Sequence, residues 1–342
     1  MEKIDFIAGS EKRFSDFISG LGKENIALIS HVDLDGITAG KVANDVLQAN
    51  LLKFVNYEDL NDSLVKELKK NKVKKIVFAD LLIKDKNFVK SLEKFADILI
   101  IDHHLFTEDF NSDKTVFLNT QGYCSAYICY YLFSKVQNLE KRDWLVAVAS
   151  IADWCYDKNS KWMQGVYEKY GDEFIPTIEG IKRGKIWKVV SDLSSALIYF
   201  KENTRKVYDS IGENFGDIGD LGKHATEVQK EIEDKTKEFY KKREDFSNGY
   251  FWEFESKFPI KSDLITGLSA RVQDKTLILA RAEGKYYSLS ARRQDGKINV
   301  ADFLGDLVKG LEGASAGGHF KAAGGSVLLK DREKLKKKLL GL

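Results

Sequence analysis

Cysteine is scarce in this sequence. Cys124, Cys129 and Cys155 are the three cysteines among 342 residues, and no pair has the CxxC spacing of a zinc site. A disulfide framework needs more pairs than these three thiols can supply. We therefore expect all three to be reduced thiols in the core.

Long apolar runs and a strong excess of charge of one sign are also absent. No apolar stretch approaches the ~18 residues of a membrane span, and the N-terminal segment is polar from its second residue. Lys and Arg number 54 and Asp and Glu 52, so the formal net charge is only +2. These features predict a soluble, cytoplasmic protein with no membrane partner. They exclude a polycation, so a nucleic-acid partner must be bound by a local basic patch.

Proline is rare as well, so domain boundaries must be found from changes of pattern. The length fits about two domains, and 43% hydrophobic residues suffice for substantial cores. Between residues 26 and 120, short apolar runs alternate with amphipathic stretches, which is typical of a parallel sheet with helices on both faces. The predicted strands are Ile26–Ser30, Leu52–Asn56, Ile76–Ala79, Ile98–Ile101 and Val116–Asn119.

Helical spacing replaces the strand pattern between about residues 124 and 245. Apolar residues from Leu221 to Phe239 form one stripe, which predicts a long connector helix. A second strand-rich region follows, with predicted strands Tyr250–Phe254, Thr276–Ala280 and Tyr286–Ser290 and a glycine-dense loop from Gly313 to Gly325. We expect an α/β protein with the active site in an interdomain cleft. Its predicted parts are a doubly wound, mainly parallel sheet domain with a helical extension (1–215), a connector helix (216–246) and a smaller α/β domain (247–342).

Carboxylate and imidazole side chains follow three of the predicted strands and one predicted helix. They are His31, Asp33 and Asp35 of the motif HVDLDG, Asp80, the triplet Asp102-His103-His104, and Asp153. Alternate residues of an extended segment point the same way, so HVDLDG is expected to present its three side chains on one side. The carboxyl ends of parallel strands meet at the edge where open α/β sheets bind ligands. We therefore expect these groups to converge there.

The charge of such a cluster predicts bound metal. Five carboxylates at one edge repel one another, and some would take up protons unless cations compensate them. Two divalent ions would nearly neutralise the cluster, and mixed carboxylate and imidazole ligands favour Mn²⁺ or a similar ion. Such a pair can activate water and stabilise charge on a phosphoryl group. Asp35 or Asp80 alone would more often be a helix N-cap, so the prediction depends on the coincidence of the motifs.

These motifs resemble those of a known superfamily. HVDLDG (31–36), FAD (78–80), DHH (102–104) and IADW (151–154) are similar, in this order, to the motifs of the DHH phosphoesterase superfamily. SARR (290–293) and AGGHFKAAGG (316–325) resemble the DHH-associated C-terminal domain. Within the superfamily, SARRQDGKIN and GLEG look most like the archaeal RecJ-like exonucleases.

The resemblance implies a role for each motif residue. One metal ion would be held by His31, Asp33 and Asp80, and a second by Asp35, Asp80, His103 and Asp153. Manganese is the expected metal, with Mg²⁺ or Co²⁺ as alternatives. The implied catalytic residues are His104, Asp80 and Asp102. His104 would face the substrate phosphate, and Asp102 would orient a ligating imidazole.

The C-terminal motifs suggest a site for the substrate. Gly317 and Gly318 would let the backbone approach a ligand, and a helix-like HFKAA segment would direct free N–H groups at an anion. Composition alone favours ordinary turns and a solvated arginine, whereas the resemblance favours a binding site. The implied substrate-binding residues are Ser290, Arg292, Gly317, Gly318 and His319, while Arg293 is expected to point elsewhere. For a polymer, the candidate contacts are Lys321, Arg292, Arg271, Tyr286 and Tyr287.

Three functions remain open. The leading one is a Mn²⁺-dependent phosphodiesterase, a RecJ-like exonuclease of DNA repair that releases nucleotides from single-stranded DNA or RNA. The second is the same chemistry on short oligonucleotides, as in nanoRNase-like enzymes, or on cyclic dinucleotides. The third is a non-catalytic subunit of a replication or repair assembly, whose protein partner would bind the helical region 160–245. His224 on the connector helix is expected to have no functional role.

Overall fold

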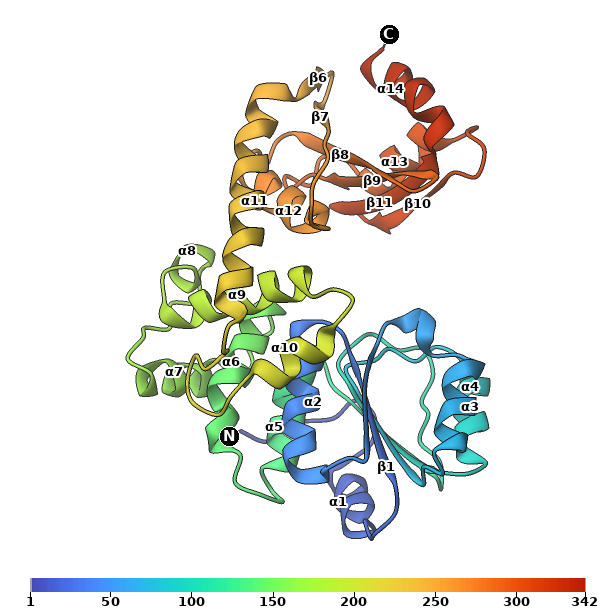
Figure 1. Ribbon diagram of the computed structural model, residues 1–342, viewed down its shortest axis with the longest axis vertical. Coiled ribbons are helices and arrows are strands. Elements are labelled where there is room, and N and C mark those ends of the chain that lie inside the picture. The colour runs from blue at the N-terminus through green and yellow to red at the C-terminus, as the bar shows by residue number, and fades with distance from the viewer. Residues whose placement is uncertain (1, 342) are drawn as a thin grey trace. The chain divides into compact units, whose positions relative to one another are not determined.

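The computed structural model describes residues 2–341, and these form two compact units that divide between Ala225 and Thr226 (Figure 1). The helix α11 (Leu221–Lys242) begins in the first unit and continues into the second, as the apolar stripe predicts. Among the described residues, no helix combines the length and apolar character that a membrane crossing requires.

The first unit is built on a parallel sheet of five strands in the order β2-β1-β3-β4-β5. The strands are β1 (Ile26–His31), β2 (Leu51–Val55), β3 (Lys75–Ala79), β4 (Asp97–Asp102) and β5 (Thr115–Asn119). Each neighbouring pair is parallel, which confirms the sheet predicted from the apolar runs. The runs are continuous because both faces of the sheet are buried.

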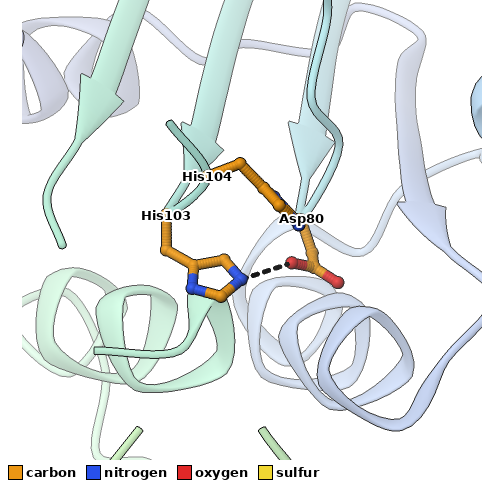
Figure 2. A group of neighbouring side chains, drawn as sticks. All are labelled: Asp80, His103 and His104. Atoms are coloured by element: carbon orange, nitrogen blue, oxygen red, sulfur yellow. Dashed lines mark ion pairs between the residues drawn. The ribbon is translucent and has the colours of Figure 1, made fainter. Parts of the chain in front are cut away.

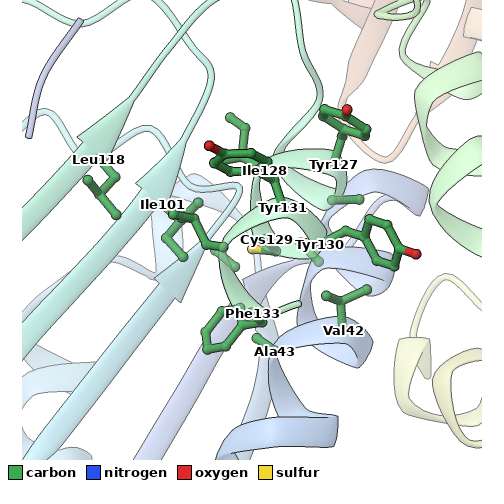
Figure 3. Packing of buried hydrophobic residues seen from close by; sticks show 14 of the residues in the cluster. Val42, Ala43, Ile101, Leu118, Tyr127, Ile128, Cys129, Tyr130, Tyr131 and Phe133 are labelled. Atoms are coloured by element: carbon green, nitrogen blue, oxygen red, sulfur yellow. The ribbon is translucent and has the colours of Figure 1, made fainter. Parts of the chain in front are cut away.

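Helices cover both faces of this sheet (Figure 1). The helices of the unit are α1 (Glu11–Ser19), α2 (Leu34–Leu47), α3 (Asp62–Lys70), α4 (Lys86–Glu93), α5 (Ser125–Phe133), α6 (Asp143–Ala152), α7 (Ser160–Lys169), α8 (Ile178–Ile181), α9 (Lys185–Tyr199) and α10 (Thr204–Ser210). On one face, Ile101 and Leu118 pack against α2 and α5 (Figure 3). On the other face, Phe78 packs with Leu68 of α3 and Phe88 of α4. A third core cluster joins α6, α7, α9 and α10.

The order of the strands creates a switch point between β1 and β3. The connection from β1 to β2 runs through α2 on one face, whereas the connection from β2 to β3 runs through α3 on the other. The crossovers therefore diverge at the carboxyl ends of β1 and β3, which are neighbours in the sheet. Open α/β sheets bind ligands in the crevice at such a point.

The second unit contains a mixed sheet in the order β10-β11-β9-β8-β7-β6, in which only the β7–β8 pair is parallel. Its strands are β6 (Glu244–Phe246), β7 (Gly249–Glu253), β8 (Thr276–Glu283), β9 (Tyr286–Arg292), β10 (Ser315–His319) and β11 (Ala322–Leu328). Its further helices are α12 (Lys261–Arg271), α13 (Val300–Val308) and α14 (Arg332–Leu340). Apolar residues of α13 and α14 pack on one face of the sheet and form its core.

Two predictions for the glycine-rich segment are wrong. The expected loop from Gly313 to Gly325 is instead the hairpin of β10 and β11, and the expected helix-like HFKAA is its turn and the start of β11. The strand β10 has the sequence SAGGH, and all five residues are exposed. A strand whose only apolar residue is one alanine carries no alternating pattern, so only its pairing with β11 defines it.

Candidate metal centre

The predicted acidic and imidazole residues lie at the carboxyl edge of the first sheet. His31 is the last residue of β1, and Asp80 directly follows the neighbouring strand β3. Asp102 is the last residue of β4, the next strand in the sheet, and His103 and His104 follow it. The switch point therefore brings these residues together.

The motif HVDLDG is not extended throughout, contrary to expectation. Asp33 is the N-cap of α2 and accepts a hydrogen bond from the Gly36 amide at 2.9 Å, so Asp35 lies in the first helical turn. A Cβ on Gly36 would lie 2.5 Å from the His31 carbonyl oxygen, so only glycine allows α2 to start this close to β1. Asp35 is 2% exposed and accepts backbone hydrogen bonds from Ser125 and Ala126, each at 2.8 Å.

Asp80 lies at the centre of the cluster. Its φ of 60° places it in the left-handed region, which is uncommon for a residue other than glycine. The residue is 1% exposed, and its Oδ1 accepts a hydrogen bond from the Ser125 hydroxyl at 3.0 Å. The buried Oδ2 has no hydrogen-bond partner among the described residues, although His31 Nδ1 lies 3.7 Å away. Buried polar atoms are normally hydrogen-bonded or bound to an ion, so we expect Asp80 Oδ2 to have a partner outside the protein chain.

His103 connects Asp80 to the other acidic residues. Its Nε2 lies 3.5 Å from Asp80 Oδ1 (Figure 2) and 3.8 Å from Asp35 Oδ2. The same atom lies 3.3 Å from Oδ2 of Asp153, which forms the C-cap of α6 as the sequence predicts. These contacts bring a residue of the helical region to the sheet edge.

His104 points to different partners from His103. Its Nδ1 lies 2.8 Å from Asp102 Oδ1, and its Nε2 lies 3.3 Å from the Tyr57 hydroxyl. Burial by itself would lower the pKa of His104, but the hydrogen bond and charge of Asp102 outweigh it and raise this pKa. Asp102 thus orients the ring of His104, whereas the motif resemblance implies that it orients an imidazole that binds metal.

Electrostatics makes the cluster costly without cations. Burial, followed by repulsion from neighbouring carboxylates, raises the pKa of Asp35 to about 6 and that of Asp80 well above its usual range. Burial and the charge of Asp35 also raise the pKa of Asp153 to about 7. Burial lowers the pKa of His103, so this ring is neutral and free to ligate. Close cations would favour the charged carboxylates and remove the penalty.

The donor atoms fit divalent metal ions. The groups His31-Asp33-Asp80, Asp80-His103-His104 and His103-Asp153-Cys155 each keep their potential ligand atoms within 4.8 Å of one another. Asp80 belongs to two of the groups. Carboxylate oxygens with neutral imidazole nitrogens suit a borderline ion such as Mn²⁺. Because burial raises the pKa of the Cys155 thiol to about 12, we do not count Cys155 as a ligand.

Two residues that contact the cluster, Tyr57 and Ser125, were not predicted from the sequence. Tyr57, in the short helix η1 (Tyr57–Asp59) after β2, stacks on the His31 ring at 4.8 Å and contacts His104. It follows a strand that ends at the same sheet edge, so the rule that found Asp80 would have found it. Ser125 holds both Asp35 and Asp80, and nothing in its local sequence indicates this.

In the second unit, four predicted substrate-binding residues lie on one face of the sheet. Arg292 pairs with Ala322, which pairs with His319, and Ser290 pairs with Gly324, which pairs with Gly317. Directly paired residues point to the same face, and this face is opposite the core that contains Leu289 and Ala291. Two glycines therefore expose bare backbone between Ser290, Arg292 and His319.

The remaining residues of that region are placed as follows. Gly318 has a φ of 146°, and a Cβ there would lie 2.4 Å from the Ala322 carbonyl oxygen, so it shapes the hairpin. Arg293 points elsewhere, as predicted, and forms an ion pair with Asp295 at 2.7 Å.

Tyr287 is fully buried in the core, so the prediction that it contacts a polymer is wrong. Tyr286, Arg271 and Lys321 are exposed. His224 packs against the rings of Tyr199 and Phe200.

The chain matches two domain families. The DHH family N-terminal domain matches residues 25–156, and the DHHA1 domain matches residues 261–341. A comparison with curated protein sequences found no match.

Solved structures share the fold at low sequence identity. RecJ from Thermus thermophilus in complex with Mn²⁺ aligns with a TM-score of 0.66 and 12% identity over 97% of this chain, which spans only 53% of RecJ. A Mg²⁺ complex of that RecJ aligns similarly. CDC45 from Entamoeba histolytica aligns with a TM-score of 0.62 and 11% identity, covering 97% of this chain and 98% of CDC45. The pGpG-specific phosphodiesterase PggH from Vibrio cholerae aligns with a TM-score of 0.56 and 12% identity, covering 93% and 98%.

The two domain matches lie in the two compact units, and the acidic cluster lies within the first match. The chain therefore belongs to the DHH superfamily, with a DHH N-terminal domain followed by a DHHA1 domain.

Proposed function

We propose that this protein is a metal-dependent phosphodiesterase that releases nucleotides from single-stranded DNA or RNA, as a RecJ-like exonuclease. The observation that carries the proposal is the environment of Asp80. Its carboxylate is buried at the switch point between His31 and His103, with one oxygen unpartnered among the described residues and a strongly raised pKa. A protein retains such a group where a bound cation stabilises it.

The ligands divide into two sets that share Asp80. His31, Asp33 and Asp80 would hold one ion, and Asp35, Asp80, His103 and Asp153 would hold the second. Manganese is the proposed metal, and when bound the pair supplies an activated water and positive charge for the phosphate oxygens. The amides of Ser125 and Ala126 keep Asp35 in place for this role.

His104 is the proposed catalytic acid. Its contact with Asp102 fixes the ring and occupies Nδ1, which leaves the proton on Nε2 to face the substrate. Because the pKa of His104 is raised, Nε2 carries this proton over a wider pH range than an ordinary histidine. The ring can therefore donate to a phosphate oxygen or to the leaving oxygen. Asp102 supports this role as a positioning residue.

The sheet face of the second unit is the proposed substrate-binding surface. Burial without a compensating acid lowers the pKa of Arg292, and no described residue forms an ion pair with its guanidinium. Such an arginine suits a phosphate, which would accept two parallel hydrogen bonds from it. Bare backbone at Gly317 and Gly324 leaves room for a nucleotide beside it.

The test is a digestion of 30-nucleotide DNA and RNA strands, labelled at either end, with added Mn²⁺. We expect stepwise loss from one end, and loss of this activity in Asp80→Asn. Asp85→Asn is the matched control, because Asp85 is an exposed N-cap after the same strand and asparagine caps equally well. Full activity of Asp80→Asn would refute the assigned role of Asp80.

Hydrolysis of dinucleotides or cyclic dinucleotides is the second candidate. The likeness to PggH favours this candidate. This chain aligns with 98% of the length of PggH but with only 53% of the length of RecJ. A parallel assay with pGpG and cyclic dinucleotides separates the two candidates. Consumption of dinucleotides without digestion of long strands would favour the second.

A non-catalytic role in replication or repair is the third candidate, and the likeness to CDC45 supports it. The implied ligand positions are all occupied by acidic or imidazole residues, which favours catalysis over this role. Stable co-purification with replication proteins, together with no hydrolysis of any of these substrates, would favour the scaffold.

A further inference from the structure

An exposed tryptophan lies directly beside the metal centre. Trp154 follows Asp153, whose Oδ2 lies 3.3 Å from His103 Nε2. Trp154 is 45% exposed, and its φ of 54° lies in the left-handed region, which is rare for a bulky residue. Residues with such a backbone conformation are concentrated at active sites and ligand contacts. The position therefore indicates a contact with whatever binds at the metal centre.

Other aromatic rings hold the Trp154 ring in place. The Tyr156 ring lies 6.2 Å from it, and Tyr156 is buried and packs edge-on against Phe174 at 5.8 Å. The Trp187 ring, in the first turn of α9, lies 6.5 Å from Trp154 on another side of the chain segment, at an interplanar angle of 49°. Trp187 is partly buried against the core cluster of α6 and α9. Because neighbouring rings restrict the Trp154 side chain, little side-chain entropy is lost when a flat ligand stacks on it.

Two basic side chains belong to the same surface. The Lys182 ammonium lies 5.5 Å from the centroid of the Trp187 ring, and Arg183 follows Lys182 in the chain. Both residues are exposed, and neither forms an ion pair with another described residue. Their positive charge attracts phosphates to a region next to the acidic cluster. Exposed rings with basic side chains beside them are the features with which proteins bind single strands, because bases stack on the rings and phosphates lie against the cations.

The position of Trp154 also fits a strand whose phosphate is bound at the metal centre. Consecutive Cα atoms lie about 3.8 Å apart, so the tryptophan begins one residue from the proposed ligand Asp153. A phosphate held at the metals therefore brings the base of an adjoining nucleotide within reach of the Trp154 ring. A protein partner could also cover an exposed ring, but the basic side chains and the continuity with the metal centre favour a phosphate-bearing strand.

We propose that Trp154 and Trp187 stack bases of the substrate strand next to the scissile phosphate, while Lys182 and Arg183 bind its backbone phosphates. This inference rests on the proposed function and makes its substrate class more specific. A stacking surface outside the hydrolytic centre favours strands of several nucleotides over dinucleotides and cyclic dinucleotides. Every base has a flat face, so the surface accepts strands of any sequence.

The test is a titration of the full-length protein in Mn²⁺ with a labelled strand of 30 thymidine nucleotides whose phosphorothioate links are hydrolysed slowly. We expect the affinity, measured by fluorescence anisotropy, to fall about tenfold in Trp154→Ala and to stay close to wild type in Trp154→Phe, which keeps a flat ring. Tyr240→Ala is the matched control, because Tyr240 is 43% exposed but belongs to the second unit. Circular dichroism of each variant establishes that weaker binding does not result from unfolding.

The dependence of this affinity on salt tests the basic side chains. Each phosphate that a cation neutralises contributes about 0.7 to the slope of log affinity against log salt for a single strand. Replacing both Lys182 and Arg183 by alanine should therefore flatten the slope by about 1.4. Lys188→Ala is the control, because Lys188 is already paired with Asp192, and it should leave the slope unchanged.

Hydrolysis separates a failure of this inference from a failure of the proposed function. In Trp154→Ala, the ratio of kcat/KM for an ordinary 30-nucleotide strand to that for pGpG should fall about tenfold. If the wild type binds strands through Trp154 but hydrolyses none, the proposed function fails and the stacking surface stands. If the wild type does not bind the strand at micromolar concentration, or if Trp154→Ala binds it as tightly as wild type, the stacking surface is refuted. The second result would assign the exposed ring to a protein partner.

Discussion

Removal of divalent metal should destabilise the first unit, and the loss should grow as the pH rises. The reason is the buried Asp35, whose pKa is raised to about 6 by burial and then by the neighbouring Asp33. The folded protein therefore binds more protons than the unfolded chain between about pH 4 and 6, and stability falls with pH across that window. Asp153, with a pKa raised to about 7, extends the window upward.

The structure sets the size of the effect. For Asp35, a rise from 3.8 to about 6 corresponds to roughly 3 kcal/mol of lost stability once the group is ionised. The Asp153 side chain is 29% exposed, so solvent screening reduces its share. In a unit of this size, roughly 3 kcal/mol shifts the melting temperature by about 6–12 °C. Thermal unfolding in EDTA from pH 4.5 to 7.5, compared with the same series in Mn²⁺, measures this shift of the melting temperature.

The comparison variant is Asp35→Asn, which removes the charge. The Ser125 and Ala126 amides donate to different oxygens of Asp35, so the single side-chain oxygen of asparagine keeps only one of these two hydrogen bonds. The variant should flatten the pH dependence in EDTA and reduce the stabilisation by Mn²⁺. If the metal-free wild type became more stable from pH 4.5 to 7.5, or if Mn²⁺ had no effect at pH 7.5, the reasoning on the charge of the cluster would be wrong.

Three further predictions concern single side chains. Gly36→Ala should lower the free energy of unfolding by about 1–3 kcal/mol, because the added Cβ would lie 2.5 Å from a carbonyl oxygen. Gly305→Ala in α13 is the control: a Cβ there meets open space, so the free energy of unfolding should rise by about 0.5 kcal/mol. Urea unfolding of both variants and the wild type measures these changes. Burial, and then the charge of Arg142, lower the pKa of Lys41 to about 8, so the unfolded chain binds more protons above pH 8. Wild-type stability should therefore rise relative to Lys41→Met by up to roughly 3 kcal/mol between pH 8 and 10.5, and unchanged relative stabilities would contradict the shift. Tyr57→Phe loses the hydroxyl beside His104 and should lower kcat about fivefold with little change in KM, and an unchanged kcat would exclude this contact from the reaction.

Most of the first sheet was predictable because its strands are buried on both faces. Continuous apolar runs such as the one in β3 give a clear signal, and Asp80 and Asp102 at the ends of the β3 and β4 runs mark the sheet edge. The long helix α11 was predictable from its single apolar stripe. The hairpin of β10 and β11 was not, because β10 is exposed along its whole length and rich in glycine.

The residues of the candidate site also divide into those that the sequence predicts and those that only the tertiary structure reveals. Asp80 and His103 were found from strand ends, but the helical start of α2 at Leu34 changed how Asp35 is held. Ser125 and Tyr57 reach the cluster only through tertiary packing.

The amino-acid sequence by itself determined the alternation of strands and helices and the identity of the acidic and imidazole residues, because both are local properties of the chain. Only the tertiary structure decided which carboxylates are buried, which side chains hold them, and where the polar face of the second sheet lies. Burial and charge repulsion depend on groups far apart in sequence, such as Asp35 and Asp153. The chemistry of the site therefore follows from the packing that brings them together.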